Sequence, residues 1–218
     1  MAGAVEVDGR RVDKPGTAVR GEVALSVRER EPFVSRGGRK LAGALDAFGL
    51  DPTGWVCLDV GASTGGFTDC LLQRGARRVL AVDVGHGLLD ARLRADPRVT
   101  LRERTNAREL APGAFDEPAD LAVFDVSFIS LLKVVPPALP LVAPGGLLLP
   151  MVKPQFEVGR GAVGKGGIVR DETARREIVA RRAGELTALG LELLGESESC
   201  LSGADGNREV FLLLRRPA

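Results

Sequence analysis

Short apolar runs alternate with helical segments from about residue 54 onward. The pattern predicts buried strands near 55–60, 78–83, 98–103, 120–125, 146–152, 191–199 and 208–214. It predicts helices near 66–74, 87–94, 130–141 and 171–189. Such alternation is typical of a mostly parallel sheet covered on both faces. The last two strands are separated by a short polar turn at 202–207, so they should form a hairpin, and we expect one antiparallel edge strand in a seven-stranded sheet.

The first 30 residues show a different pattern. Short strands are expected at 5–7, 11–12 and 23–27, and the Asp8-Gly9 pair between the first two is a hairpin signal. These residues contain too few apolar side chains for a core of their own. We therefore expect an appendage at 1–30 with its charged linker, and a second domain at 31–218. Ser35 should cap a helix that continues to about Phe48 and ends at Gly49.

The stretch 56–69 is the one around which the larger domain is organised. An apolar run reaches Asp59, a glycine-rich turn follows, and a helix begins near Phe67. This arrangement presents backbone N–H groups to a nucleotide-like ligand. A dinucleotide fingerprint would read G-x-G-x-x-G, but Ser63 stands at its second glycine position. That departure disfavours NAD and favours S-adenosylmethionine, which we expect to contact Asp59, Gly61, Ala62, Ser63, Gly65, Gly66 and Phe67.

Further candidates follow the other predicted strands, because ligands of such sheets bind at the carboxyl ends of the strands. Asp83, 22 residues after Gly61, is placed to bind the ribose hydroxyls of an adenosine. Thr105 and Asn106 could form an edge for adenine, and Asp125 would lie between cofactor and substrate. The less favoured alternative is that Asp83 merely caps the loop before the next helix.

Lysine is rare among the basic residues of this chain. Lysine and arginine total 30 against 29 acidic residues, a net charge of +1, and only five of the 30 are lysine. Lysine can lose its proton when buried, whereas arginine effectively cannot. Lys40 lies in a predicted helix and Lys153 leaves a buried strand, where desolvation favours the neutral amine. Ordinary alternatives are a solvated helix face for Lys40, a strand-end side chain for Lys153 and an edge-strand charge for Glu209.

Composition also excludes several classes of protein. The single histidine and three unpaired cysteines give no ligand set for a metal, and no secretory segment is evident, so a reducing cytoplasm is expected. The 19 uncharged residues between Lys133 and Lys153 match a bilayer in length. Five of them are proline, however, and a Gly-Gly pair interrupts the run, so we predict no membrane span.

Five stretches together resemble the TlyA family of rRNA ribose 2′-O-methyltransferases, whose catalytic domain is of the FtsJ (RrmJ) type, and they lie within residues 33–215. They are V-S-R-G-G-R-K-L at 34–41, L-D-V-G-A-S-T-G-G-F at 58–67, D-V-S-F-I-S at 125–130, V-K-P-Q-F-E at 152–157 and G-N-R-E at 206–209. The resemblance implies a Rossmann-like methyltransferase fold and a catalytic tetrad of Lys40, Asp125, Lys153 and Glu209. Family members begin with a small RNA-binding domain, and residues 1–30 resemble only its hairpin end.

The resemblance implies methyl transfer from S-adenosylmethionine to a ribose 2′-hydroxyl of RNA, with rRNA in a ribosomal subunit as the partner. Lys153 would be the general base or polarise the oxygen. Arg36, Arg39, Arg160 and Lys165 would bind RNA phosphates. Two other hypotheses remain open: a small-molecule O-methyltransferase, and a membrane-active protein, because relatives are often labelled haemolysins. An RNA-binding module without catalysis would not need the glycine turn together with Asp59 and Asp83.

Overall fold

The computed structural model describes residues 5–12, 14, 16–27, 31–158, 168–169, 171–203 and 206–218. The chain divides into two compact units, Met1–Pro32 and Phe33–Ala218. The division lies two residues beyond the boundary expected from the sequence.

The first unit holds a three-stranded antiparallel sheet with strand order β2-β1-β3. Its strands are β1 (Val5–Val7), β2 (Arg10–Val12) and β3 (Leu25–Val27). Asp8 and Gly9 both have positive φ, 49° and 74°, as the tight hairpin turn between β1 and β2 requires. The Asp8 carboxylate also accepts a hydrogen bond from the Ala24 N–H at 2.9 Å, which ties the turn to the third strand. The predicted hairpin is therefore confirmed.

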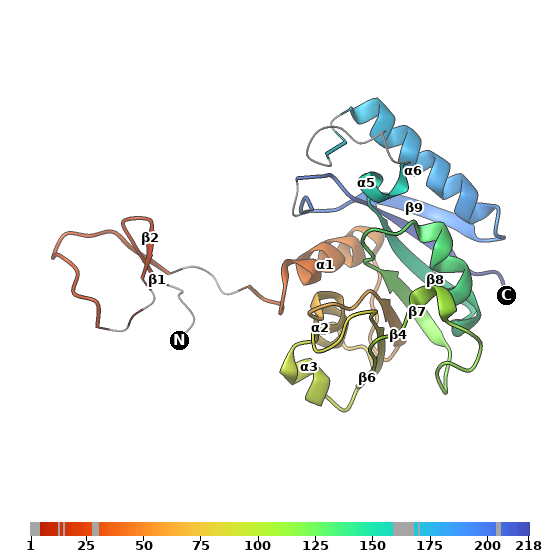
Figure 1. Ribbon diagram of the computed structural model, residues 1–218, viewed down its shortest axis with the longest axis horizontal. Helices are drawn as coiled ribbons and strands as arrows, with labels where there is room; N and C mark the ends of the chain where they lie inside the picture. The colour runs from red at the N-terminus through yellow and green to blue at the C-terminus, as the bar shows by residue number, and fades with distance from the viewer. Residues whose placement is uncertain are drawn as a thin grey trace. The chain divides into compact units, whose positions relative to one another are not determined.

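The second unit is built on a seven-stranded sheet with the order β6-β5-β4-β7-β8-β10-β9 (Figure 1). Its strands are β4 (Val56–Val60), β5 (Arg78–Val82), β6 (Val99–Arg102), β7 (Ala119–Phe124), β8 (Val142–Val152), β9 (Glu192–Glu198) and β10 (Val210–Arg215). The five strands from β4 to β8 are parallel, and β10 runs antiparallel to both of its neighbours. The expected mostly parallel fold class is confirmed.

The position of the antiparallel strand corrects the expectation of an antiparallel edge strand. β10 lies one place inside the edge, and β9 is the edge strand. The burial of the two strands explains the order. Five of the six residues of β10 are buried, whereas β9 is exposed or half-buried along its whole length. The apolar strand therefore takes the interior position and the polar strand takes the edge.

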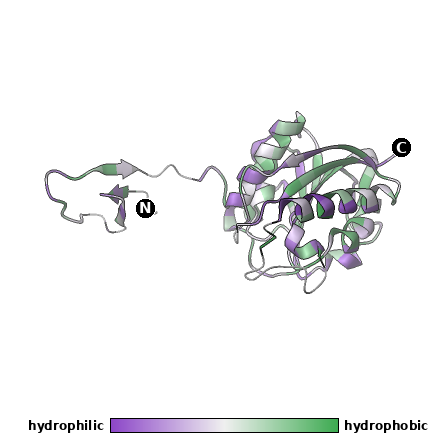
Figure 2. Cartoon of the chain, turned by 90° about the horizontal axis from the view of Figure 1, so that it is seen from above, coloured by the Kyte–Doolittle hydropathy of each residue, from purple (hydrophilic) through white to green (hydrophobic). Residues whose placement is uncertain are grey.

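Helices cover both faces of this sheet (Figure 1). They are α1 (Arg36–Phe48), α2 (Gly66–Gln73), α3 (Ala91–Ala95), α4 (Val135–Ala138), α5 (Pro154–Glu157) and α6 (Glu172–Thr187). Alternate residues of β4 enter two separate cores. Val56, Leu58 and Val60 pack with residues of α4 and α6, and Cys57 packs with residues of α1 and α2. The apolar colouring of Figure 2 follows the strands, which are enclosed between these helices.

Several element boundaries differ from expectation for local reasons. The predicted helix at 130–141 is divided into a 3₁₀ turn Leu131–Lys133, the short α4 and a second 3₁₀ turn Leu139–Leu141. Prolines in this stretch lack the N–H that a continuous helix needs. β8 begins at Val142, before the start expected near residue 146, and includes the Pro-Gly-Gly stretch at 144–146. Gly49 ends α1 with φ 64° as predicted, but the Ser35 side chain makes no capping hydrogen bond.

Within the described ranges, every helix is too short or too polar to cross a bilayer.

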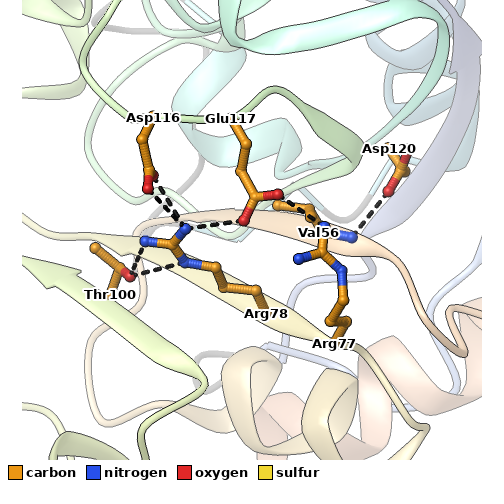
Figure 3. Close-up of polar contacts among 7 residues, drawn as sticks. All are labelled: Val56, Arg77, Arg78, Thr100, Asp116, Glu117 and Asp120. Carbon is orange, nitrogen blue, oxygen red and sulfur yellow. Dashed lines mark hydrogen bonds and ion pairs between the residues drawn. The ribbon is translucent and has the colours of Figure 1, made fainter.

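Polar contacts join the amino ends of the strands (Figure 3), opposite the carboxyl ends at which open α/β sheets bind ligands. Arg78, at the start of β5, lies 3.0 Å from Asp116 and 2.8 Å from Glu117, and donates to the Thr100 hydroxyl on β6 at 2.8 Å. At the start of β4, the Val56 N–H donates to the Asp120 carboxylate of β7 at 2.8 Å. These contacts connect the strands at their amino ends and leave the loops at the carboxyl ends free to line a site.

Candidate active site

The strand order reverses between β4 and β7, and the carboxyl ends of these two strands meet closely. The Asp125 N–H, just after β7, donates to the Val60 carbonyl at 3.1 Å. Gly61, just after β4, has φ 91°, and a Cβ added there would lie 2.6 Å from the Asp125 carbonyl oxygen. A crevice at such a reversal is where open α/β sheets bind their ligands.

Replacing Gly61 with alanine should weaken cofactor binding strongly, because the new methyl group would push the two strand ends apart. Both the positive φ and the contact with backbone oppose any side chain here. We expect the affinity for S-adenosylmethionine to fall by at least tenfold in calorimetry. Gly113 also has positive φ but nothing within 4 Å of an added Cβ, so Gly113→Ala is the control for backbone strain alone. Equal affinities in Gly61→Ala and wild type would contradict this account.

Two adjoining cavities open at this crevice. The larger, about 860 Å³, is lined by Asp83, Thr105 and Asn106. The smaller, about 420 Å³, is lined by Lys40, Lys153 and Glu209. The two cavities share the wall residues Gly61, Ser63, Asp125, Ser127, Phe128 and Phe156. A molecule in one cavity can therefore approach a molecule in the other across this shared wall.

The larger cavity contains three of the predicted adenosine contacts. The Asp83 carboxylate is oriented by backbone, because it accepts from the Ser63 N–H at 2.7 Å and from the Gly85 N–H at 2.6 Å. Ser63 has a positive φ of 49°, which turns its N–H toward that carboxylate. Thr105 and Asn106 lie on the wall as expected. A fixed carboxylate beside polar side chains suits the hydroxyls and amino group of a nucleoside.

Two residues of the predicted cofactor set line neither cavity. Asp59 is completely buried, and its carboxylate accepts from the Thr68 hydroxyl of α2 at 2.7 Å. Gly65 serves packing instead, because an added Cβ would lie 2.3 Å from a methyl carbon of Leu93. Both residues lie beneath the turn and not on its surface, and their contact with the cofactor stays a prediction.

Burial has a marked electrostatic effect on Asp59. Desolvation raises the pKa of this carboxyl to about 7, the neighbouring charges of Asp125 and Asp83 act in the same direction, and the hydrogen bond from Thr68 opposes them. The second carboxyl oxygen, Oδ1, has no hydrogen-bond partner among the described residues. The neutral form of Asp59 is therefore favoured up to near-neutral pH.

The remaining residues of the predicted cofactor turn lie on the smaller cavity. Ala62, Gly66 and Phe67 all line it. Gly66 also permits a close approach of α1 and α2, since an added Cβ would lie 2.2 Å from the Ser35 hydroxyl oxygen. The turn therefore contributes wall to both cavities, with Gly61 and Ser63 common to the two.

The four residues of the predicted tetrad meet in the smaller cavity as two ion pairs. The Lys40 Nζ lies 2.5 Å from the Glu209 carboxylate, and the Lys153 Nζ lies 2.5 Å from the Asp125 carboxylate. Lys153 also donates to the Ser127 hydroxyl at 2.9 Å. Both lysines are only 8% exposed and Glu209 is 3% exposed. Charges so deeply buried need partners, and here each lysine has a carboxylate.

The inverted direction of β10 explains how Glu209 reaches this place. Val210, the first residue of β10, pairs with Val152, the last residue of β8. An antiparallel strand begins where its neighbour ends, so Glu209 comes to lie at the same end of the sheet as Lys153. Lys40 approaches from α1, 169 positions earlier in the chain than Glu209.

The structure adds residues that sequence reasoning missed. Ser127, Gln155 and Phe156 line the smaller cavity. Phe128 lies on both cavities, is 90% exposed and has a positive φ of 62°, a strained value for an aromatic residue. Its ring centroid is 4.8 Å from that of Phe156. The signal available in the sequence was an apolar residue in a segment that follows a strand and is not itself a strand.

Two of the four predicted RNA-binding residues fall within the described part of the chain. Arg36 is exposed and lines the smaller cavity, and Arg39 is exposed on the same helix, α1. Arg160 and Lys165 lie outside the described residues.

Three features define the class of Rossmann-like S-adenosylmethionine-dependent methyltransferases: the strand order of the sheet, the glycine turn after β4, and Asp83 after β5. Comparison with known proteins agrees with this. The chain belongs to the FtsJ-like methyltransferase family, whose match spans residues 33–216. S-Adenosylmethionine is accordingly the methyl donor that the family implies.

Individual relatives confirm the resemblance to the TlyA family. The chain is 50% identical to the 16S/23S rRNA (cytidine-2′-O)-methyltransferase TlyA of Mycobacterium tuberculosis, over 98% of this chain and 81% of that protein. It is 40% identical to Hemolysin A of Brachyspira hyodysenteriae, over 97% of this chain and 88% of that protein. The solved structure of a candidate hemolysin from Streptococcus thermophilus matches with a TM-score of 0.85 and 38% identity, over all of this chain and 80% of the other.

Proposed function

We propose that this protein transfers a methyl group from S-adenosylmethionine to the 2′-hydroxyl of a ribose in ribosomal RNA, with cytidine as the nucleotide. The observation that carries the proposal is the pair of lysine–carboxylate contacts in a cavity that shares a wall with the nucleoside cavity. The names of the rRNA-methylating relatives support the choice of substrate.

The larger cavity would hold the adenosine of the cofactor. Asp83 would accept hydrogen bonds from the ribose hydroxyls, and Thr105 and Asn106 would border the adenine. The glycine turn would lead the methionine part toward the smaller cavity, along Gly61, Ala62, Ser63, Gly66 and Phe67. Asp125, on the shared wall, would place a negative charge near the sulfonium.

The smaller cavity would hold the acceptor ribose. Lys153 would bind the 2′-oxygen and take up its proton as the oxygen attacks the methyl carbon. Lys153 would do this as the neutral amine, whose nitrogen is oriented by Asp125 and Ser127, while Lys40 and Glu209 would hold the ribose. No covalent intermediate is needed, because the oxygen–carbon bond forms as the carbon–sulfur bond breaks, and alignment of the three atoms supplies much of the rate.

The surroundings of the smaller cavity suit a nucleic acid. Arg36 and Arg39 would contact phosphates, together with Arg160 and Lys165, so binding should weaken as salt rises. We also infer that Met1–Pro32 belongs to an RNA-binding module, as its resemblance to the hairpin end of such a domain suggests. Methylation of ribosomal RNA would take place in the cytoplasm.

Transfer of tritiated methyl groups tests the proposal directly. Purified protein, S-adenosylmethionine and unmodified ribosomal subunits should give labelled rRNA, with the label on a ribose 2′-oxygen after nuclease digestion. Label in catechol-like small acceptors but not in rRNA would favour a small-molecule O-methyltransferase. Dye release from liposomes without cofactor, combined with unlabelled rRNA, would favour the membrane-active alternative that the hemolysin names raise.

Phe128 provides a prediction specific to an RNA substrate. An exposed ring beside Phe156 is a platform on which the target base can stack. Loss of one base–aromatic contact costs about 1–3 kcal/mol. Phe128→Ala should therefore raise KM for rRNA on the order of 10- to 100-fold and leave cofactor affinity unchanged.

Two further variants separate stacking from simple filling of space. Phe128→Trp keeps a flat aromatic face and should retain most of the activity. Phe128→Leu keeps apolar bulk without that face and should behave like the alanine variant. Equal KM values for the leucine and tryptophan variants would contradict stacking.

A further inference from the structure

Glu157 is a buried carboxylate that none of the steps above uses. It is the last residue of the single-turn helix α5, four residues after Lys153, and it is 7% exposed. Its Oε1 accepts a hydrogen bond from the Leu131 N–H at 2.9 Å. Its Oε2 lies 2.7 Å from a guanidinium nitrogen of Arg182 in α6, whose side chain is 5% exposed.

Glu157 completes a series of contacts between the segments 125–131 and 153–157. Asp125 meets Lys153 at one end, and the rings of Phe128 and Phe156 meet in the middle. The Leu131 N–H meets Glu157 at the other end. Each segment follows a parallel strand, and each carries residues that line the smaller cavity.

Arg182 holds this series against the body of the domain. Its guanidinium pairs with Glu157 and, on its other side, with Glu185 of the same helix. The neighbouring Arg181 donates to the Glu157 carbonyl oxygen at 3.0 Å. Both the side chain and the backbone of Glu157 are therefore fixed by α6. A buried ion pair is a weak source of stability compared with an apolar pair of the same size, which raises the question of what else it does.

We propose that Glu157, held by Arg182, is a positioning residue for methyl transfer. It sets the distance between the two segments and thereby the direction in which Lys153 faces the methyl donor. Glu157 itself contacts neither cavity, since it is absent from both sets of lining residues. The inference rests on the proposed function, because it assigns Lys153 its role in the reaction.

The variant that tests this most sharply is Glu157→Gln. Glutamine keeps an acceptor for the Leu131 N–H but loses the charge that fixes Arg182. A displacement of about 1 Å can reduce a rate on the order of 100-fold. We expect kcat for rRNA methylation to fall about 10- to 100-fold, while KM for rRNA and the dissociation constant of S-adenosylmethionine change less than about threefold.

Glu185→Gln is the matched control. It removes the other carboxylate partner of the same arginine, but Glu185 contacts neither segment in the contacts described for it. Its kcat should stay within about twofold of wild type. If Glu185→Gln loses as much activity as Glu157→Gln, general loosening of α6 explains the result and the inference is wrong.

A second measurement keeps the inference independent of activity. Hydrogen–deuterium exchange of peptides covering 125–133 should be faster in Glu157→Gln, while peptides covering α2 and β5 exchange as in wild type. An unchanged exchange rate, or a kcat within twofold of wild type, would overturn the inference. Should wild-type protein fail to methylate rRNA, the proposed function would be wrong, and exchange at 125–133 would then decide alone whether Glu157 fixes the segments.

Discussion

Replacing Lys153 with alanine should lower methyl transfer to rRNA by about 10²- to 10⁴-fold, the usual contribution of a positioned proton acceptor. Lys153→Arg should be nearly as damaging. Arginine keeps the positive charge beside Asp125 but effectively cannot release a proton to become a base. Cofactor affinity should change little in either variant, because Lys153 lines the smaller cavity and not the larger one.

Single-turnover assays with saturating S-adenosylmethionine would measure the rate, and calorimetry would measure cofactor affinity. Ser127→Ala serves as a graded comparison, since it removes a neutral acceptor from Lys153 while the ion pair to Asp125 stays. It should lose about tenfold or less, the magnitude of one neutral hydrogen bond. Near wild-type rates in Lys153→Arg would show that charge alone suffices and that Lys153 is no base.

Replacing Asp59 with asparagine should change how stability depends on pH. The folded-state pKa is about 7 and the ordinary value is 3.8, so the folded protein binds this proton more tightly than the unfolded chain does. The stabilisation from the bound proton is complete below the ordinary value and is lost as pH rises toward 7. A difference of this size corresponds to at most about 4 kcal/mol. Asparagine carries no such proton. The stability of the variant relative to wild type should therefore increase as pH rises from the ordinary value toward 7.

Urea unfolding of both proteins at several pH values between about 4 and 8 would measure the effect. The free energy of unfolding of Asp59→Asn, relative to wild type, should increase with pH and level off above about 7. Thr68→Val removes the hydrogen bond that lowers the pKa of Asp59. In this variant the loss of stability with rising pH should therefore continue to higher pH than in wild type. A difference between Asp59→Asn and wild type that is constant with pH would contradict the assignment of a neutral buried carboxyl.

The interior strands could be predicted from sequence because a strand covered on both faces is almost wholly apolar, as V-C-L-D-V in β4 and V-F-L-L-L in β10 are. The predictions that were wrong concern the position of β10 in the sheet and the boundaries of some elements. The chain sequence does not say that β10 inserts between β8 and β9, because that choice depends on which strand the helices can cover. The prediction of one continuous helix at 130–141 was wrong. The spacing of its apolar residues suits a helix, but its prolines lack the N–H groups that a continuous helix needs.

Some residues of the candidate site could be predicted from sequence and others could not. The sequence pointed to Asp125, Lys153 and Glu209 as polar residues beside strand ends and to Lys40 as a rare lysine in a predicted helix. The family resemblance grouped the four. The burial of Asp59 could not be foreseen from sequence: the strand continues through Val60 and buries the Asp59 carboxylate. Phe128 and Glu157 went unnoticed, because exposure of an aromatic ring and burial of a charge are properties of the folded state alone.

The late position of β10 in the chain has a consequence for synthesis on the ribosome. Strands β4 to β8, with the glycine turn and Asp83, are all made before β10, whose insertion brings Glu209 to Lys40. A nascent chain that ends before this strand contains every residue of the nucleoside cavity but leaves a buried lysine without its carboxylate. On the proposed roles, the ability to bind the methyl donor can thus arise earlier than the ability to use it, because the smaller cavity is complete only after β10 has inserted.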